Sequence, residues 1–94
     1  MRNRVIWKFP MPAGGWNAIN VPRDAQVRLV GLDPATGQPT IWVELDPEAV
    51  PIMRTFKVYG TGEQIEGDGG FPYDIHVGSV IAAPFVWHIY EVRS

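Results

Sequence analysis

Residues 26–45 read QVRLVGLDPATGQPTIWVEL, and this stretch decides the fold class. In its last part Ile41, Val43 and Leu45 alternate with tryptophan and glutamate, the period of two that is typical of a half-buried β-strand. The part before the prolines alternates in the same way. Between the two runs lies DPATGQP, in which proline presets one backbone angle and glycine allows positive φ, as a tight turn requires. We therefore predict that this stretch forms a β-hairpin.

The rest of the chain repeats this pattern of short alternating runs separated by turn residues. Nine prolines are spread along the sequence, and because an interior proline breaks a helix, helices longer than about three turns are excluded. Strands are expected at Arg4–Phe9, Ala18–Val21, Gln26–Asp33, Thr40–Leu45, Arg54–Tyr59, Tyr73–Val80 and Phe85–Val92. The spacing of Val27 and Val30 would also suit a short helix. The sequence predicts one all-β domain over residues 1–94, a small antiparallel β-sandwich or barrel of about six to eight strands, mostly connected by hairpins.

One face of each strand is expected to enter the core. The main core residues should be Trp7, Phe9, Leu29, Val43, Phe56, Val58, Trp87 and Ile89. The last strand carries apolar side chains on both faces, and a domain of 94 residues has little material to cover a second face. We therefore expect a homo-oligomer in which this second face lies in a subunit interface.

Composition and charge exclude several classes of function. The chain has no cysteine, so it can form neither disulfides nor cysteine-based metal sites. Residues 1–32 carry five basic residues and one acidic residue, whereas residues 33–74 carry two basic and eight acidic ones, and the net charge is −2. A protein that binds duplex nucleic acid normally has a cationic excess, so we expect only a small anionic ligand. No apolar run is long enough for a signal peptide or a membrane span, which predicts a cytoplasmic protein that does not bind membranes.

Four blocks of the sequence resemble an uncharacterised family of small phage and prophage proteins, known only as a domain of unknown function. They are IWKFPM at 6–11, IWVELDP at 41–47, FKVYGTG at 56–62 and VWHIYE at 86–91, in the order found in that family. The resemblance implies a phage origin and a compact β fold. It implies no activity, and it transfers no catalytic residue.

Residues that could support catalysis or metal binding form no strong pattern. The two histidines, His76 and His88, lie on separate expected strands without the close spacing of a metal motif. Ser79 lacks the turn sequence of a serine nucleophile. Three acids near residues 63–68 could provide paired carboxylates, but in a glycine-rich segment they are more often solvated. We expect neither an enzyme nor a resident metal or other cofactor.

A binding site is better supported, at the end of the strand Arg54–Tyr59. The turn at residues 60–62 reads Gly-Thr-Gly, in which backbone N–H groups and a hydroxyl can converge on an oxyanion. Aromatic side chains can stack on a base, and cations can pair with phosphates. The candidate ligand-binding residues are Lys8, Trp42, Arg54, Lys57, Tyr59, Thr61, Gly62, His88 and Tyr90. Residues three apart on a strand face opposite sides, so within one subunit Arg54 and Lys57 should not share a pocket unless a bulge intervenes. Lys57 and Tyr59 should point away from the core, in a pocket that a second subunit would close.

These residues predict a small phage-encoded binding protein. Its expected role is counter-defence, in which it sequesters a small anionic ligand, such as a nucleotide immune signal, without cleaving it. The alternative is a protein–protein interaction module, either an inhibitor of a host protein or an accessory phage structural component. If substitution of Lys57 leaves anion binding intact, the basic region around Lys8 and Arg28 becomes the better candidate site.

Overall fold

The structure is a computed structural model, and it describes residues 3–65 and 74–92. Within these ranges it consists of seven β-strands and contains no helix. The strands are β1 (Val5–Pro10), β2 (Trp16–Pro22), β3 (Gln26–Leu32), β4 (Pro39–Leu45), β5 (Pro51–Gly60), β6 (Asp74–Ala82) and β7 (Phe85–Val92). No helix in the described ranges therefore has the length and apolarity needed to cross a membrane.

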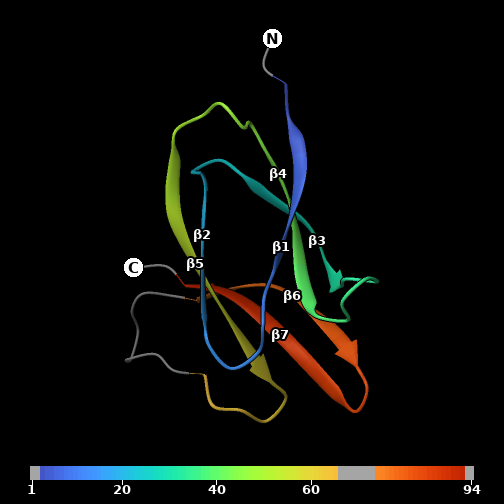
Figure 1. The fold of residues 1–94 in the computed structure, drawn as a ribbon. Coiled ribbons are helices and arrows are strands. Elements are labelled where there is room, and N and C mark those ends of the chain that lie inside the picture. The colour runs from blue at the N-terminus through green and yellow to red at the C-terminus, as the bar shows by residue number, and fades with distance from the viewer. Residues whose placement is uncertain (1–2, 66–73, 93–94) are drawn as a thin grey trace.

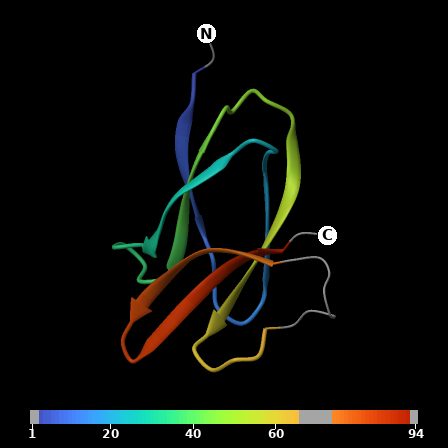
Figure 2. The same ribbon diagram turned by 180° about the vertical axis from the view of Figure 1, so that it is seen from behind.

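The strands form two antiparallel sheets (Figures 1 and 2). The small sheet has the order β1-β4-β3, and the large sheet has the order β2-β5-β7-β6. The all-β, sandwich-like fold class is thereby confirmed. The connections differ from those expected, because only β3–β4 and β6–β7 are hairpins between neighbouring strands. The chain passes from one sheet to the other after β1, β2 and β4, which is why strands close in sequence are often far apart in the sheets.

The β3–β4 hairpin has the turn that its sequence predicts. The carbonyl oxygen of Asp33 accepts hydrogen bonds from the N–H groups of Thr36 (3.2 Å) and Gly37 (2.7 Å). Gly37 has φ of 73°, a conformation that a residue with a Cβ adopts only with strain. The Asp33 carboxylate also accepts the Ala35 N–H at 2.9 Å. These contacts fix the register that places Ile41 opposite Val30.

The core lies between the two sheets. Its buried members are Met11, Val21, Ala25, Ile41, Val43, Leu45, Phe56, Val58 and Ile89. Four of the eight expected core residues are among them, and Phe9 and Trp87 pack against this cluster while partly buried. Leu29 and Trp7 differ from expectation, with 56% and 47% of their surface exposed.

A β-bulge explains the exposure of Leu29. The register between β3 and β4 shifts between Val27 and Leu29, so that Leu29 lies opposite Trp42 rather than opposite a core residue. Val27 and Val30 both pack against the core. The three-residue spacing that resembled a short helix is therefore the result of one extra residue in a strand. Trp7 is exposed because β1 is an edge strand of the smaller sheet, and an edge strand is covered less completely.

Candidate functional site

The face of the large sheet that is turned away from the small sheet carries a row of aromatic and basic side chains. We call it the outer face. Trp16 on β2 lies opposite Lys57 on β5, Lys57 lies opposite Tyr90 on β7, and Tyr90 lies opposite His76 on β6. The four side chains share this face because Phe56 and Val58, which flank Lys57 in sequence, point into the core. The row therefore crosses all four strands of the large sheet.

Aromatic rings surround the charge at the centre of this row. The Nζ atom of Lys57 lies 5.0 Å from the centroid of the Trp16 ring and 5.3 Å from that of Tyr59. Tyr90 meets Tyr59 edge to face, with ring centroids 5.7 Å apart. Cation–π contacts of this kind are worth about 0.5–1 kcal/mol at exposed sites. They hold the ammonium group beside the Trp16 ring, which is 58% exposed.

A second row on the same face is joined by hydrogen bonds. The Nε2 atom of His88 lies 2.8 Å from the Thr61 hydroxyl, and its Nδ1 atom lies 2.7 Å from the Ser79 hydroxyl. The Ser79 hydroxyl also lies 3.0 Å from Nε2 of His76. Both ring nitrogens of His88 therefore have partners, which fixes the orientation of its ring. The chain of groups runs from the turn after β5 to β6 and presents polar atoms next to the aromatic row.

A hollow of about 230 Å³ opens where the turn after β5 meets this face. Its walls come from Tyr59, Gly60, Thr61, Gly62, Glu63, Ile65, His88 and Tyr90. Gly62 has φ of 90°, which glycine adopts without strain. The Glu63 carboxylate accepts the Gly60 N–H at 2.8 Å and so holds the turn against the strand. The hollow thus combines aromatic surface, a hydroxyl, an imidazole and one carboxylate.

The structure brings six of the nine candidate residues together here. Tyr59, Thr61, Gly62, His88 and Tyr90 line the hollow, and the ammonium group of Lys57 lies over the Tyr59 ring. Tyr59 points to the outer face as expected, but it is only 2% exposed. Tyr90, Lys57 and the turn at 60–65 cover its ring, so Tyr59 forms the floor of the hollow and is not an open stacking surface.

The other three candidates lie elsewhere. Lys8 and Trp42 belong to the small sheet, and the Lys8 ammonium group binds the Asp33 carboxylate at 2.8 Å. Arg54 points to the opposite side of β5 from Lys57, where its Nε and Nη2 atoms donate to the two carboxylate oxygens of Glu91 at 2.7 and 2.8 Å. The Glu91 hydrogen bond raises the pKa of Arg54 further above its ordinary value. These residues do not contribute to the outer-face site.

Three side chains of the outer face were not among the candidate ligand-binding residues. Trp16 was missed because β2 begins at this residue, two positions before the expected strand. The sequence offers His76 only as a candidate metal ligand and Ser79 only as a candidate nucleophile. A signal was present, because both lie on the expected strand beside Phe85–Val92, and a hairpin pairing would have placed them near His88.

The described residues contain no group of three or more histidine, aspartate or glutamate side chains that could hold a metal ion. Among the three acids considered for paired carboxylates, Glu63 lies in the hollow, and Glu66 and Asp68 lie outside the described residues. The glycine-rich stretch 60–70 is expected to be the longest irregular segment, and its residues 66–70 also lie outside the described ranges.

The chain belongs to the family described as "Domain of unknown function (DUF7352)", whose model matches residues 2–94. No curated protein and no solved structure matches it.

Proposed function

We propose, from the chemistry of the outer face, that this protein binds a small anionic ligand that contains an aromatic ring. The family to which the chain belongs has no assigned function. A nucleotide is the proposed class. The ligand is held without being cleaved. A phosphate needs a cation, which Lys57 supplies beside the exposed Trp16 ring, and a base needs aromatic surface, which Trp16 and the Tyr90 ring in the hollow both offer.

One observation carries the proposal: the Lys57 ammonium group lies between the Trp16 ring and the ring of Tyr59, which lines the hollow of about 230 Å³. The hydroxyl of Thr61 and the imidazole of His88 provide hydrogen-bonding groups at its wall. The Glu63 carboxylate would repel a phosphate but accept a hydrogen bond from the N–H groups of a base. We therefore propose that the base enters the hollow and that the phosphate stays near Lys57.

The size of the hollow supports a role for a second subunit. Pockets for small organic ligands usually measure about 300–1,000 Å³, which exceeds the 230 Å³ available in one chain. A second copy of the chain over the outer face would deepen the site. This homo-oligomer is part of the proposal, as is the context given by the resemblance to phage and prophage proteins. In that context the protein would sequester a nucleotide signal of host immunity.

A panel of ligands tests the proposal. Purified protein is heated with mononucleotides, cyclic dinucleotides, the matching nucleosides, ribose 5-phosphate and inorganic phosphate, and binding is confirmed by calorimetry. A ligand at 100 times its dissociation constant should raise stability by about 2.7 kcal/mol. We expect at least one nucleotide to bind more tightly than its nucleoside and than ribose 5-phosphate, and to be recovered intact after denaturation.

Two variants locate the binding. Lys57→Met keeps the packing between the two rings but removes the charge, and should weaken binding at least about tenfold. Arg28→Met is the matched control, because Arg28 is an exposed cation of the small sheet that pairs with Glu44. Equal affinities for wild type and Lys57→Met, or binding of ribose 5-phosphate as tight as that of the nucleotide, would contradict the proposal.

The alternative, a protein–protein interaction module, has one observation in its favour. Ile6 and Leu29 on the outside of the small sheet are 58% and 56% exposed, on either side of the central strand β4 that carries Trp42. Apolar side chains on an exposed sheet face are typical of interaction surfaces. Specific capture of one host protein that is lost on Leu29→Asp, together with no binding across the nucleotide panel, would favour this alternative.

A further inference from the structure

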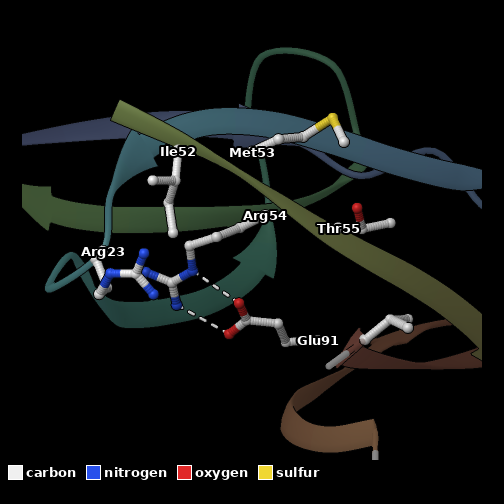
Figure 3. A pocket seen from close by; sticks show the side chains of 7 residues that line it. Arg23, Ile52, Met53, Arg54, Thr55 and Glu91 are labelled. Atoms are coloured by element: carbon white, nitrogen blue, oxygen red, sulfur yellow. Dashed lines mark hydrogen bonds and ion pairs between the residues drawn. The ribbon is translucent and has the colours of Figure 1, made fainter. Parts of the chain in front are cut away.

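A second polar hollow lies on the other side of β5, between the turn after β2, the first half of β5 and the end of β7. It measures about 380 Å³, and Arg23, Arg54 and Glu91 line it together with apolar side chains (Figure 3). A neighbouring hollow of about 270 Å³ shares the same three charged residues. The three charged side chains therefore line both hollows.

The positive charge of this group exceeds its negative charge. The Glu91 carboxylate accepts from Nε and Nη2 of Arg54, and the Ala25 carbonyl oxygen accepts from Nη1 at 2.8 Å. A guanidinium group has five N–H bonds, so one N–H on each terminal nitrogen of Arg54 has no acceptor among the described residues. Arg23 is exposed, and it makes no ion pair or hydrogen bond with any described residue. Two arginines thus face one carboxylate.

The ion pair with Glu91 alone does not explain the position of Arg23. In Figure 3 the Arg23 side chain reaches toward the guanidinium group of Arg54. Two like charges in this arrangement repel each other, and an anion placed between them removes the repulsion. Arg54 is held rigidly, because its side chain is 12% exposed and that of its partner is 5% exposed. A buried, paired arginine and an exposed one together make a suitable clamp for a planar or tetrahedral oxyanion.

We propose that Arg23 and Arg54 bind an oxyanion, a phosphate or a carboxylate, in the hollow between the turn after β2 and the end of β7. Ile52, which lies on the same side of β5 as Arg54, supplies apolar surface for the rest of the ligand. The site is separate from the outer face, because Arg54 and Lys57 point to opposite sides of β5. A test of this oxyanion site is therefore independent of the test of the proposed function.

The side-chain Nε–H signals of the arginines in a ¹H–¹⁵N spectrum test this site. The protein is titrated with inorganic phosphate, with succinate, and with sodium chloride at matched ionic strength. We expect the signals of Arg23 and Arg54 to shift saturably at millimolar concentrations of one oxyanion or of both, and not with chloride. Saturation with phosphate alone would identify a phosphorylated ligand, and saturation with succinate alone would identify a carboxylate.

Arg23→Met should weaken this binding at least about tenfold, because it removes one arm of the clamp and leaves the Arg54–Glu91 pair intact. Arg28→Met is the control for loss of one exposed positive charge, and it should bind the oxyanion as the wild type does. Unchanged affinity in Arg23→Met, an equal loss in Arg28→Met, or shifts that follow ionic strength in all three titrations would overturn the proposal.

Discussion

Gly78 on β6 of the large sheet lies against Val30 on β3 of the small sheet, and replacing it with alanine should destabilise the fold. A methyl group at this position would lie 2.6 Å from Cγ2 and 2.8 Å from Cβ of Val30. Carbon atoms in contact are normally about 3.5–4.0 Å apart, so the methyl group is about 1 Å too close. The Cβ atoms of both residues are fixed to their backbones, and rotation of the Val30 side chain cannot relieve the second contact. Strand β6 must therefore move away from β3.

The size of the effect follows from this clash. Overpacking of a core costs about 1–3 kcal/mol, and the loss of the flexibility of glycine in the unfolded chain returns about 0.4–1 kcal/mol. We expect a net loss of about 1–2 kcal/mol. For a domain of this length each kcal/mol lowers Tm by about 4–8 °C.

The assay is urea unfolding of four proteins that form a double-mutant cycle: wild type, Gly78→Ala, Val30→Ala and the double variant. Because Val30→Ala removes the atom of the 2.6 Å contact, it should cost at least about 1 kcal/mol less in the Gly78→Ala background than in the wild type. Gly31→Ala is the control, because a methyl group there would lie 3.9 Å from the Trp42 ring, an ordinary contact. Equal stabilities of Gly78→Ala and Gly31→Ala, or strictly additive effects in the cycle, would refute this reasoning.

Two further predictions concern ion pairs. Glu91→Leu leaves Arg54 buried without its carboxylate and should lower the free energy of unfolding by about 3–5 kcal/mol. Replacing both residues with apolar ones should lower it less. Urea unfolding measures both, and a double variant as unstable as Glu91→Leu would contradict this prediction. The hydrogen bonds from Lys8 and from the Ala35 N–H lower the pKa of Asp33 from its ordinary value of 3.8. The ionised Asp33 carboxylate therefore stabilises the fold above about pH 3.8, and this stabilisation is lost as the pH falls through the lower pKa of the folded state. Asp33→Asn should therefore show a shallower fall of the urea midpoint over this acid range, and an acid profile as steep as that of the wild type would rule out this role of Asp33.

The sequence predicted the strands well because the signal for them is local. Alternation of side chains and the positions of turn residues indicated all seven strands, and β7 has the expected bounds, Phe85–Val92. Pairing of strands is not local. The order β2-β5-β7-β6 depends on which faces bury each other, and nothing in the spacing of turns requires β1 and β2 to enter different sheets.

The same distinction separates the confirmed core from the exposed residues. Phe56 and Val58 are buried as their alternation predicts, because β5 lies inside its sheet. Leu29 is exposed because one extra residue in β3 reverses the side on which it lies. Tyr59 is buried although its alternation points it outward, because the turn that follows folds over its ring. Bulges and covering turns cannot be found from a period of two.

The candidate site was predicted where its residues are close in the sequence. Lys57, Tyr59, Thr61 and Gly62 come from one strand end and the turn that follows. Trp16 is far from them in sequence and reaches Lys57 only through the pairing of β2 with β5. Lys8 and Arg54, the two cations of the expected site that lie away from the outer face, both pair with carboxylates from other strands or turns.

The central claim is that ligands bind on the outer face of the large sheet, and the indole N–H signals of the four tryptophans test it most directly. Each tryptophan has one such signal, and single Trp→Phe variants assign them. On titration with the tightest-binding nucleotide of the panel, the account predicts a saturable shift of the Trp16 signal, with the Trp42 signal unchanged because it lies on the other sheet. A saturable shift of Trp42 with Trp16 unmoved would place the ligand on the small sheet and contradict the account.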